Sequence, residues 1–390
     1  MRIALAMEYP LMQQGGTEVL VLELARRLGA DHEIVLVTGD KNRASLPEDV
    51  SKIIFAHVPW DASNGTKASA QALAKSLADY KVDLAHFHFG GTYEWSSNRI
   101  WRCPVFYAAR KIPCFSTNHL VVEWFNCGVH PERSMVYKYA AQAFAWVNRS
   151  LLYSRLKCEV CVSKHDRERL VRMFPQFRGK IIQRYHSLLN QASDGEVNLR
   201  RDSIVLCVGT IGGRKAQHIL AEAFALVANR HPEWKLILAG RTGLSEDLER
   251  IKAIIAKNKL EGRIQVPGRL SDDETLRLFK TASLFAMPSL QEGLGLSLQE
   301  ALFQGCVAVG TRVGGIPELI DDGVNGTLVP SGDVPALSQA LDNFMSDPAL
   351  LQKRRMETRA SIVRKGMTSE AMVATYREIY RDILEGKMPG

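Results

Sequence analysis

The sequence contains no long hydrophobic run. No apolar stretch approaches the ~20 residues that a membrane-spanning helix needs, and Met1 to Pro10 has the pattern of a first β-strand and not of a signal peptide. Both absences favour a protein that is made and kept in the cytoplasm.

Metal and disulfide patterns are also lacking. The seven cysteines are an odd number without regular spacing, which is typical of reduced thiols. Cys158 and Cys161 would face opposite sides of a strand, so they predict no zinc or redox pair. His86 and His88 would share a face of a strand, but no clear third ligand accompanies them. We therefore expect no metal site, and cleft lining or core packing for these histidines.

The positive charge is confined to one half of the chain. The net charge of +8 lies wholly in residues 1–190, with the highest density from Arg133 to Arg184. Within that segment Met135 to Leu156 mixes aromatic, leucine and basic residues, which predicts a helix lying on an anionic membrane surface. The alternative is a core helix with a solvated basic face. Because no nucleic-acid-binding motif accompanies the basic residues, we expect no nucleic-acid partner.

The order of strands and helices predicts an α/β fold. A chain of 390 residues exceeds what one hydrophobic core usually supports, so two domains are expected. Short apolar strands alternate with amphipathic helices twice over, beginning at Ile3 to Met7 and again at Ser203 to Gly209. The polar stretch between these series, residues 191–202, is the expected linker, and the second domain is expected at 203–366.

Two glutamates frame a glycine loop in the second series. Glu292 and Glu300 are placed where a hydrophobic strand, Leu284 to Ser289, passes through Gly293 and Gly295 into a helix. A helix N-terminus attracts an anion such as a diphosphate, and a nearby carboxylate can accept two hydrogen bonds from a vicinal diol. The arrangement predicts a nucleotide-sugar pocket. The alternative is a solvated loop acid and an ordinary helix surface acid.

Each series also opens with a strand and a glycine loop. Gly15-Gly16 follows the first strand, and Gly209 to Lys215 follows the strand that opens the second series. Neither loop is a G-x-G-x-x-G. The second loop carries the adjacent cations Arg214 and Lys215, which favours a diphosphate bound by side-chain charge over a dinucleotide bound by backbone alone.

From Val205 to about Asp333 these features occur in an order that resembles the donor domain of a GT-B fold glycosyltransferase of family four (glycosyl transferases group 1), the retaining group that uses nucleotide sugars. The residues that carry the resemblance are the loop with Lys215, Leu236 to Gly240, Val266-Pro267-Gly268, Pro288-Ser289, the Glu292/Glu300 pair and Gly314-Gly315-Ile316-Pro317-Glu318. The first half matches more loosely, through Gly15 to Glu18, Asp83 to His88, Thr117 to His119 and Val162-Ser163.

The resemblance implies two Rossmann-like parallel-sheet domains facing across a cleft. It also implies that the last helix, Ser369 to Leu384, crosses back onto the first domain, which would then comprise residues 1–190 plus 369–390. The amphipathic stripe of that helix agrees with such packing.

Site roles follow from the same resemblance. Glu300 would bind the ribose hydroxyls, Lys215 would neutralise the diphosphate, and Gly16 beside Gly15 would present its backbone to the distal phosphate. Glu292 and the amides of Gly293, Leu294, Gly295 and Leu296 would hold the donor sugar and phosphate, and His119 would lie near the anomeric carbon. Gly268, Thr210 and Arg214 complete the expected donor-binding set. The residue pattern alone favours a structural role for His119.

Two positions depart from the family pattern. The family loop usually has an arginine directly after its first glycine, where this chain has Thr210; Arg214 is a candidate substitute, although neighbouring loop residues rarely point alike. Before the linker, Arg184-Tyr185-His186-Ser187 replaces an N-G-x-D type turn, which indicates altered acceptor or hinge geometry.

The function implied is retaining transfer of a sugar from a UDP- or GDP-linked donor to a hydroxyl of a glycan or lipid-linked acceptor, in cell-surface polysaccharide or glycolipid synthesis at the inner membrane face. The nucleotide sugar is a co-substrate, and no cofactor or metal is required; the absence of a D-x-D carboxylate pair agrees. Two alternatives stay open, a sugar-nucleotide epimerase of the same fold and an inactive nucleotide-binding partner protein.

Overall fold

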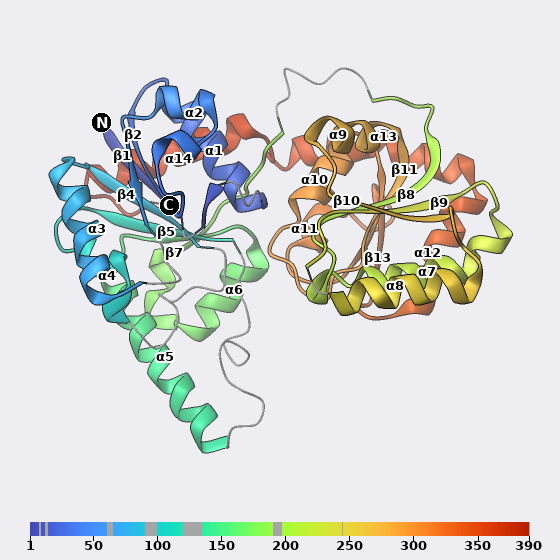
Figure 1. Cartoon of the computed structure of the whole chain (residues 1–390), viewed down its shortest axis with the longest axis horizontal. Helices are drawn as coiled ribbons and strands as arrows, with labels where there is room; N and C mark the ends of the chain where they lie inside the picture. Colours follow the sequence, from blue (N-terminus) through green and yellow to red (C-terminus); the bar gives the residue numbers. More distant parts are fainter. Residues whose placement is uncertain are drawn as a thin grey trace. The chain divides into compact units, whose positions relative to one another are not determined.

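The computed structural model describes residues 1–7, 9–11, 15–60, 65–89, 100–119, 135–189, 197–243 and 245–389. The chain divides into two compact units (Figure 1). Unit 1 contains Met1–Leu188 and Glu370–Gly390, and unit 2 contains Leu189–Ser369. Residues 191–196 of the expected linker lie outside the described residues.

Unit 1 is built on a seven-stranded sheet with the order β3-β2-β1-β4-β5-β6-β7. All its strand pairs are parallel. The strands are β1 (Arg2–Met7), β2 (Glu33–Thr38), β3 (Ala56–Pro59), β4 (Leu84–Phe89), β5 (Cys114–Asn118), β6 (Glu159–Cys161) and β7 (Ile181–Gln183). Their near-continuous apolar character is that of a sheet covered on both faces.

Helices cover both faces of this sheet. They are α1 (Gly16–Leu28), α2 (Glu48–Ile53), α3 (Lys67–Asp79), α4 (Pro104–Ala108), α5 (Met135–Arg155), α6 (Lys164–Met173) and α14 (Ser369–Leu384). Alternate residues of β1 face opposite cores: Ala4 packs with α3 to α6, whereas Ile3 packs with α1, α2 and α14. The helix predicted at Ser369 to Leu384 is confirmed, and it buries Tyr376 and Tyr380 in unit 1.

Unit 2 contains a six-stranded parallel sheet with the order β10-β9-β8-β11-β12-β13. Its strands are β8 (Asp202–Val208), β9 (Lys235–Ala239), β10 (Ile264–Gly268), β11 (Ala282–Met287), β12 (Val307–Thr311) and β13 (Gly326–Val329). The order reverses between β8 and β11, which places the switch point of a doubly wound sheet at their carboxyl ends.

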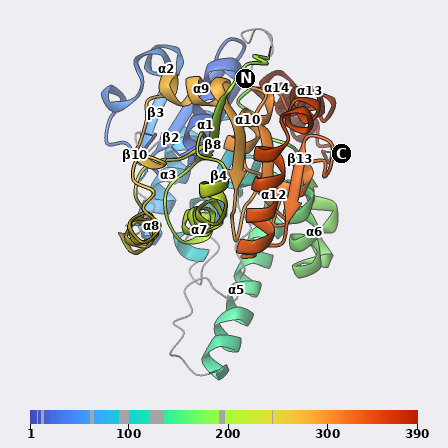
Figure 2. The same ribbon diagram turned by 90° about the vertical axis from the view of Figure 1, so that its right-hand side faces the viewer.

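The helices of unit 2 are α7 (Gln217–Val227), α8 (Ser245–Asn258), α9 (Asp272–Thr281), α10 (Leu296–Phe303), α11 (Ile316–Leu319), α12 (Val334–Ser346) and α13 (Pro348–Arg364). Helices α7 and α12 lie side by side (Figure 2) and share one core with α8, whereas α10 packs against α13. Local signals set several ends; Ser271 and Glu274, for example, form a capping box at the start of α9. The expected α/β fold class, with two parallel-sheet Rossmann-like domains, is confirmed.

Candidate functional site

The two loops that the sequence singles out in unit 2 meet at the switch point. One follows β8 and ends in a 3-10 turn, Gly213–Lys215, and the other joins β11 to α10. The amide of Leu290 donates a hydrogen bond of 2.7 Å to the carbonyl oxygen of Arg214, which ties the loops together. Gly314 completes the junction, because a Cβ there would overlap the carbonyl oxygen of Glu292.

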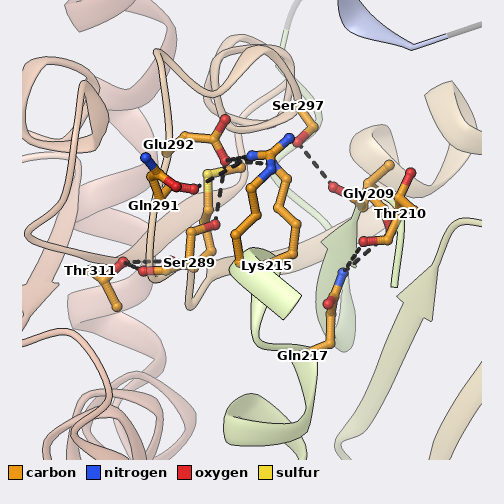
Figure 3. Close-up of polar contacts among 12 residues, drawn as sticks. Gly209, Thr210, Lys215, Gln217, Ser289, Gln291, Glu292, Ser297 and Thr311 are labelled. Atoms are coloured by element: carbon orange, nitrogen blue, oxygen red, sulfur yellow. Dashed lines mark hydrogen bonds and ion pairs between the residues drawn. The ribbon is translucent and has the colours of Figure 1, made fainter. Parts of the chain in front are cut away.

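Glu292 is the centre of this junction. Its Oε2 lies 2.5 Å from Nζ of Lys215 and 3.8 Å from Nη1 of Arg214, and it accepts a 3.4 Å hydrogen bond from Oγ of Ser289 (Figure 3). The side chain is only 10% exposed. Glu292 is therefore a buried, paired acid, and the alternative of a solvated loop residue is wrong.

Electrostatics keep Glu292 ionised. Burial alone would raise the pKa of its carboxyl group, but the charges of Lys215 and Arg214 and the hydrogen bonds from Lys215 and Ser289 outweigh burial and hold that pKa below its ordinary value. Both cations of the loop thus converge on one carboxylate. The expectation that neighbouring loop residues point apart does not hold for Arg214 and Lys215, because the tight 3-10 turn brings both to the same acid.

Gln217 shapes the glycine loop, and sequence reasoning missed it. Its buried amide nitrogen donates to the carbonyl oxygens of Gly209, at 3.3 Å, and Thr210, at 3.1 Å (Figure 3). Its amide oxygen accepts from the backbone N–H of Gly212 at 3.4 Å. The one signal available was the position of this glutamine, which is the first residue of α7 and follows shortly after the glycine loop.

Thr210, where the family usually has arginine, is exposed beside another cation. Nε of Arg241 lies 3.5 Å from Oγ1 of Thr210. Arg241 follows β9, the strand next to β8, and nothing in the sequence pattern links it to the loop.

Glu300 lies a turn into α10 and is partly exposed. Burial, with a smaller contribution from the charge of Asp272, raises the pKa of its carboxyl group to about 7. Among the described residues no side chain or amide forms a hydrogen bond with this carboxyl group. It is therefore available to a ligand, as the pairing of ribose hydroxyls would require.

The amino end of α10 has the features of an anion site. Gly295 adopts φ +98° at the N-cap, which favours glycine, and no side chain of the described residues caps the helix. Oγ of Ser297 donates to the carbonyl oxygen of Val208 at 3.1 Å, which fixes α10 against β8. Gly293 and Leu294 are buried in the loop before it. The first amides of the helix are thus left for a ligand or solvent.

Gly268 ends β10 at the same edge of the sheet. Its carbonyl oxygen accepts a 2.8 Å hydrogen bond from the amide of Gly240, and a Cβ at Gly268 would meet nothing within 4 Å. The structure thus gathers the expected donor-binding residues of unit 2 along one edge of its sheet, formed by the ends of β8, β9, β10 and β11.

The expected site residues of unit 1 lie at the carboxyl ends of its own strands. Gly15 is the N-cap of α1, and the carboxylate of Glu18 folds back against it. His119 directly follows β5, and its amide donates to the carbonyl oxygen of Phe89 at 3.0 Å. Burial lowers the pKa of His119 to about 3, so its imidazole is neutral.

A cluster of buried histidines surrounds His119. Nδ1 of His88 lies 3.2 Å from Nε2 of His119, and His86 contacts Tyr380, at 3.0 Å, and Thr117, at 2.8 Å. His186, from the segment that departs from the family pattern, lies 2.5 Å from the hydroxyl of Tyr376 in α14. Within the described ranges no group of three His, Cys, Asp or Glu residues is placed to hold a metal ion. His119 is therefore connected to α14 by its hydrogen bond with His88, the ring contact between His88 and His86, and the hydrogen bond of His86 with Tyr380.

The aromatic and basic helix of the sequence is α5, whose amino-terminal half projects beyond the sheet of unit 1 (Figures 1 and 2). Phe144, Val147 and Leu151 form an exposed stripe at helical spacing. Arg149 does not contribute to a solvated basic face, because it is buried in a 2.6 Å ion pair with Glu159. Residues 133 and 134 of the predicted segment lie outside the described residues. In the part of the chain that the structure describes, no helix combines the length and apolarity needed to cross a bilayer.

Comparisons with known proteins agree with this geometry. The family model "Glycosyltransferase Family 4" matches residues 14–184, and "Glycosyl transferases group 1" matches residues 192–363. The D-inositol 3-phosphate glycosyltransferase of Streptomyces avermitilis is 25% identical over 371 residues, covering 86% of this chain and 76% of that protein.

Solved structures share the fold. A glycosyltransferase from Rickettsia africae superimposes with a TM-score of 0.76 and 18% identity, covering 99% of both chains. Anabaena HepE in complex with UDP-glucose superimposes with a TM-score of 0.71 and 16% identity, covering 99% of this chain and 100% of HepE. Since the two family models account for both parallel-sheet units, the chain belongs to the family 4 glycosyltransferases and is an enzyme with their GT-B fold.

Proposed function

We propose that the protein is a retaining glycosyltransferase that moves a sugar from a UDP- or GDP-linked donor to a hydroxyl of a glycan or lipid-linked acceptor. The observation that carries the proposal is one edge of the unit 2 sheet. There the Lys215–Glu292 ion pair and the carboxyl group of Glu300, which has no hydrogen-bond partner among the described residues, flank the start of α10. The likeness to HepE, solved with UDP-glucose, supports a nucleotide-sugar donor.

The chemistry needs stabilisation of a leaving nucleoside diphosphate more than a strong base. The developing charge would be met by Lys215 and the positive end of the α10 dipole. Glu300 would hold the ribose, and Glu292 the donor sugar. His119, neutral at physiological pH, would act as a hydrogen-bonding group near the anomeric carbon and not as a charged acid. The acceptor hydroxyl would then enter on the face that the diphosphate leaves.

Product analysis with radiolabelled UDP- and GDP-sugars tests this proposal. We expect a new glycosidic bond with the anomeric configuration of the donor when lipid-linked and free glycan acceptors are offered, with inositol phosphate added to the panel because one relative is named for it. Inversion of the anomeric centre would contradict the retaining mechanism. An isomerised nucleotide sugar would indicate an epimerase, and no conversion by a protein that binds nucleotide would indicate an inactive partner.

We also propose that α5 brings unit 1 to an anionic membrane surface at the inner face of the membrane, where polysaccharide or glycolipid precursors would be glycosylated. Its exposed stripe of Phe144, Val147 and Leu151 supplies apolar area, and Lys164, Arg172 and Arg178 supply exposed positive charge on the adjoining segment. Trp146 links the two segments through a 3.0 Å hydrogen bond to the carbonyl oxygen of Met173. Apolar and electrostatic contributions to interfacial binding add.

Vesicle co-sedimentation tests the membrane contact. We expect binding to vesicles with anionic lipid, weaker binding to neutral vesicles, and loss of binding in a Phe144→Ser, Leu151→Ser variant. Leu226→Ser, an exposed leucine of α7 in unit 2, is the matched control and should bind as the wild type does. Equal partitioning to neutral and anionic vesicles would remove the electrostatic argument.

A further inference from the structure

Three basic residues lie on or beside the glycine loop of unit 2, and they differ in whether a carboxylate pairs with them. Lys215 and Arg214 share one carboxylate, that of Glu292, at 2.5 and 3.8 Å. A diphosphate that approaches Lys215 therefore meets a cation whose field Glu292 partly cancels. The family pattern supplies a second cation from the position of Thr210, and in this chain that position carries no charge.

Arg241 is a second kind of cation at this edge of the sheet, one that pairs with no acid among the residues that the structure describes. In the described part of the chain no carboxylate lies within ion-pair distance of its guanidinium group, and its Nε lies 3.5 Å from Oγ1 of Thr210. The side chain is exposed, so its terminal nitrogens remain open to a ligand. A planar guanidinium group offers paired donors that match phosphate oxygens.

The backbone fixes Arg241 against the donor loop. Its carbonyl oxygen accepts a 2.9 Å hydrogen bond from the amide of Ile211, and the amide of Gly243 donates to the carbonyl oxygen of Ile211 at 2.7 Å. Gly240 permits this approach, since a Cβ there would overlap the carbonyl oxygen of Gly209. Arg241 is thus held beside Thr210 by the ends of two adjacent parallel strands, β8 and β9.

We propose that Arg241 is the second cation for the donor diphosphate, reaching it from the end of β9 in place of a side chain at position 210. The inference rests on the proposed function, because it assumes that a nucleoside diphosphate occupies this edge of the sheet. Arg241 and Lys215 then contribute charge from separate strands. Arg214, the substitute considered from sequence, serves instead to hold Glu292.

Calorimetric titration of the full chain with UDP, GDP and uridine tests this assignment. Arg241→Gln is expected to bind the preferred nucleoside diphosphate about tenfold more weakly than the wild type, because one charge-assisted phosphate contact is lost. Its affinity for uridine should be unchanged. Lys235→Gln is the matched control, since Lys235 is an exposed cation at the opposite end of the same strand, and it should bind as the wild type does.

A charge-restoring variant sharpens the test. Thr210→Arg in the Arg241→Gln background returns a cation to the loop and should recover most of the lost affinity. Undiminished diphosphate binding by Arg241→Gln, or an equal loss for uridine, would overturn the assignment of Arg241 to the diphosphate while leaving the donor site itself intact. If the wild type bound neither UDP nor GDP, the proposed function would fail, and this inference with it.

Discussion

Nζ of Lys215 lies 2.5 Å from Oε2 of Glu292, so the proposed donor site contains a largely buried ion pair. Removing Lys215 leaves the buried carboxylate of Glu292 with weaker compensation, from the more exposed Arg214 at 3.8 Å and the hydrogen bond of Ser289. We expect Lys215→Met to abolish nucleoside diphosphate binding and to lower the free energy of unfolding of unit 2 by about 3 kcal/mol. Urea denaturation with hydrogen exchange on unit 2 peptides measures the loss. The double variant with Glu292→Gln should regain most of the stability but none of the binding, and additive losses would contradict the coupling.

The raised pKa of Glu300 predicts that unit 2 loses stability as pH rises. Its folded pKa of about 7 exceeds the ordinary glutamate value of 4.5, so the folded state binds more protons between these pH values. The stability that this group contributes is therefore present at low pH and is lost as pH rises through 7. Glu300→Gln should stabilise unit 2 at pH 8 by about 2 kcal/mol and change little at pH 5. Urea denaturation of both proteins at pH 5 and pH 8 measures the change in the free energy of unfolding. An equal change at the two pH values would exclude a raised pKa for Glu300.

The histidine cluster predicts acid sensitivity of unit 1. Burial lowers the pKa of His86, His88, His119 and His186 below the ordinary value of 6.5. The unfolded state therefore gains protons first as pH falls below 6.5, and each histidine should cost up to about 1.4 kcal/mol of stability per pH unit. Hydrogen exchange at pH 7.5 and 5.5 should show β4 and β5 losing protection while β11 of unit 2 does not. The same pH dependence in both units would argue against the cluster as the cause.

The Arg149–Glu159 pair predicts that α5 supports the carboxyl end of β5, beside His119. Glu159 also accepts a 3.2 Å hydrogen bond from Asn118, the residue before His119. Arg149→Met should destabilise unit 1 by about 3 to 5 kcal/mol, because the buried carboxyl group of Glu159 loses its ion-pair partner. Arg149→Met with Glu159→Gln should restore stability, as judged by thermal unfolding. If the single variant were as stable as the wild type, the pair would have no structural role.

Substitutions at Gly314 and Gly323 distinguish a steric clash from backbone strain. Gly314 adopts φ +52°, and a Cβ there would overlap the backbone of Glu292. Gly314→Ala should displace the acidic loop and weaken nucleoside diphosphate binding more than tenfold in calorimetric titration. Gly323→Ala is the matched control, since Gly323 adopts φ +77° with nothing within 4 Å of its Cβ. Comparable losses in both variants would assign the effect to φ alone.

Local patterns carried most of the fold and part of the site. Strand and helix periodicity predicted the unit 2 sheet, the central strands of the unit 1 sheet and α14, because apolar spacing is a local property of the chain. It missed the short strands β3 and β7 at the two edges of the unit 1 sheet. The spacing of Glu292 and Glu300 located the loop where β11 meets α10. Whether these residues have the donor-binding and catalytic roles that the family implies stays a prediction.

Long-range contacts were beyond sequence reasoning. The hydrogen bonds of Gln217 are local, because they bind the loop just before its own helix. In contrast, Arg241 contacts Thr210 from a neighbouring strand, and Arg149 of α5 pairs with Glu159 of β6. Such pairings depend on how strands are ordered in space, which no single-chain periodicity encodes. The convergence of Arg214 and Lys215 on Glu292 likewise follows from a 3-10 turn, whose conformation the residue pattern does not predict.

The packing of α14 has a consequence for how the protein is made. Unit 2 is one continuous segment, whereas the sheet of unit 1 has Ile3 and Leu5 in a core that also needs Tyr376 and Tyr380. During translation the ribosome delivers the first strands of unit 1 long before this covering helix, and domains otherwise tend to fold in the order of synthesis. Unit 2 can therefore finish folding while one face of the unit 1 sheet is not yet covered by α14. We expect the half of the chain that is synthesised first to reach its native structure last.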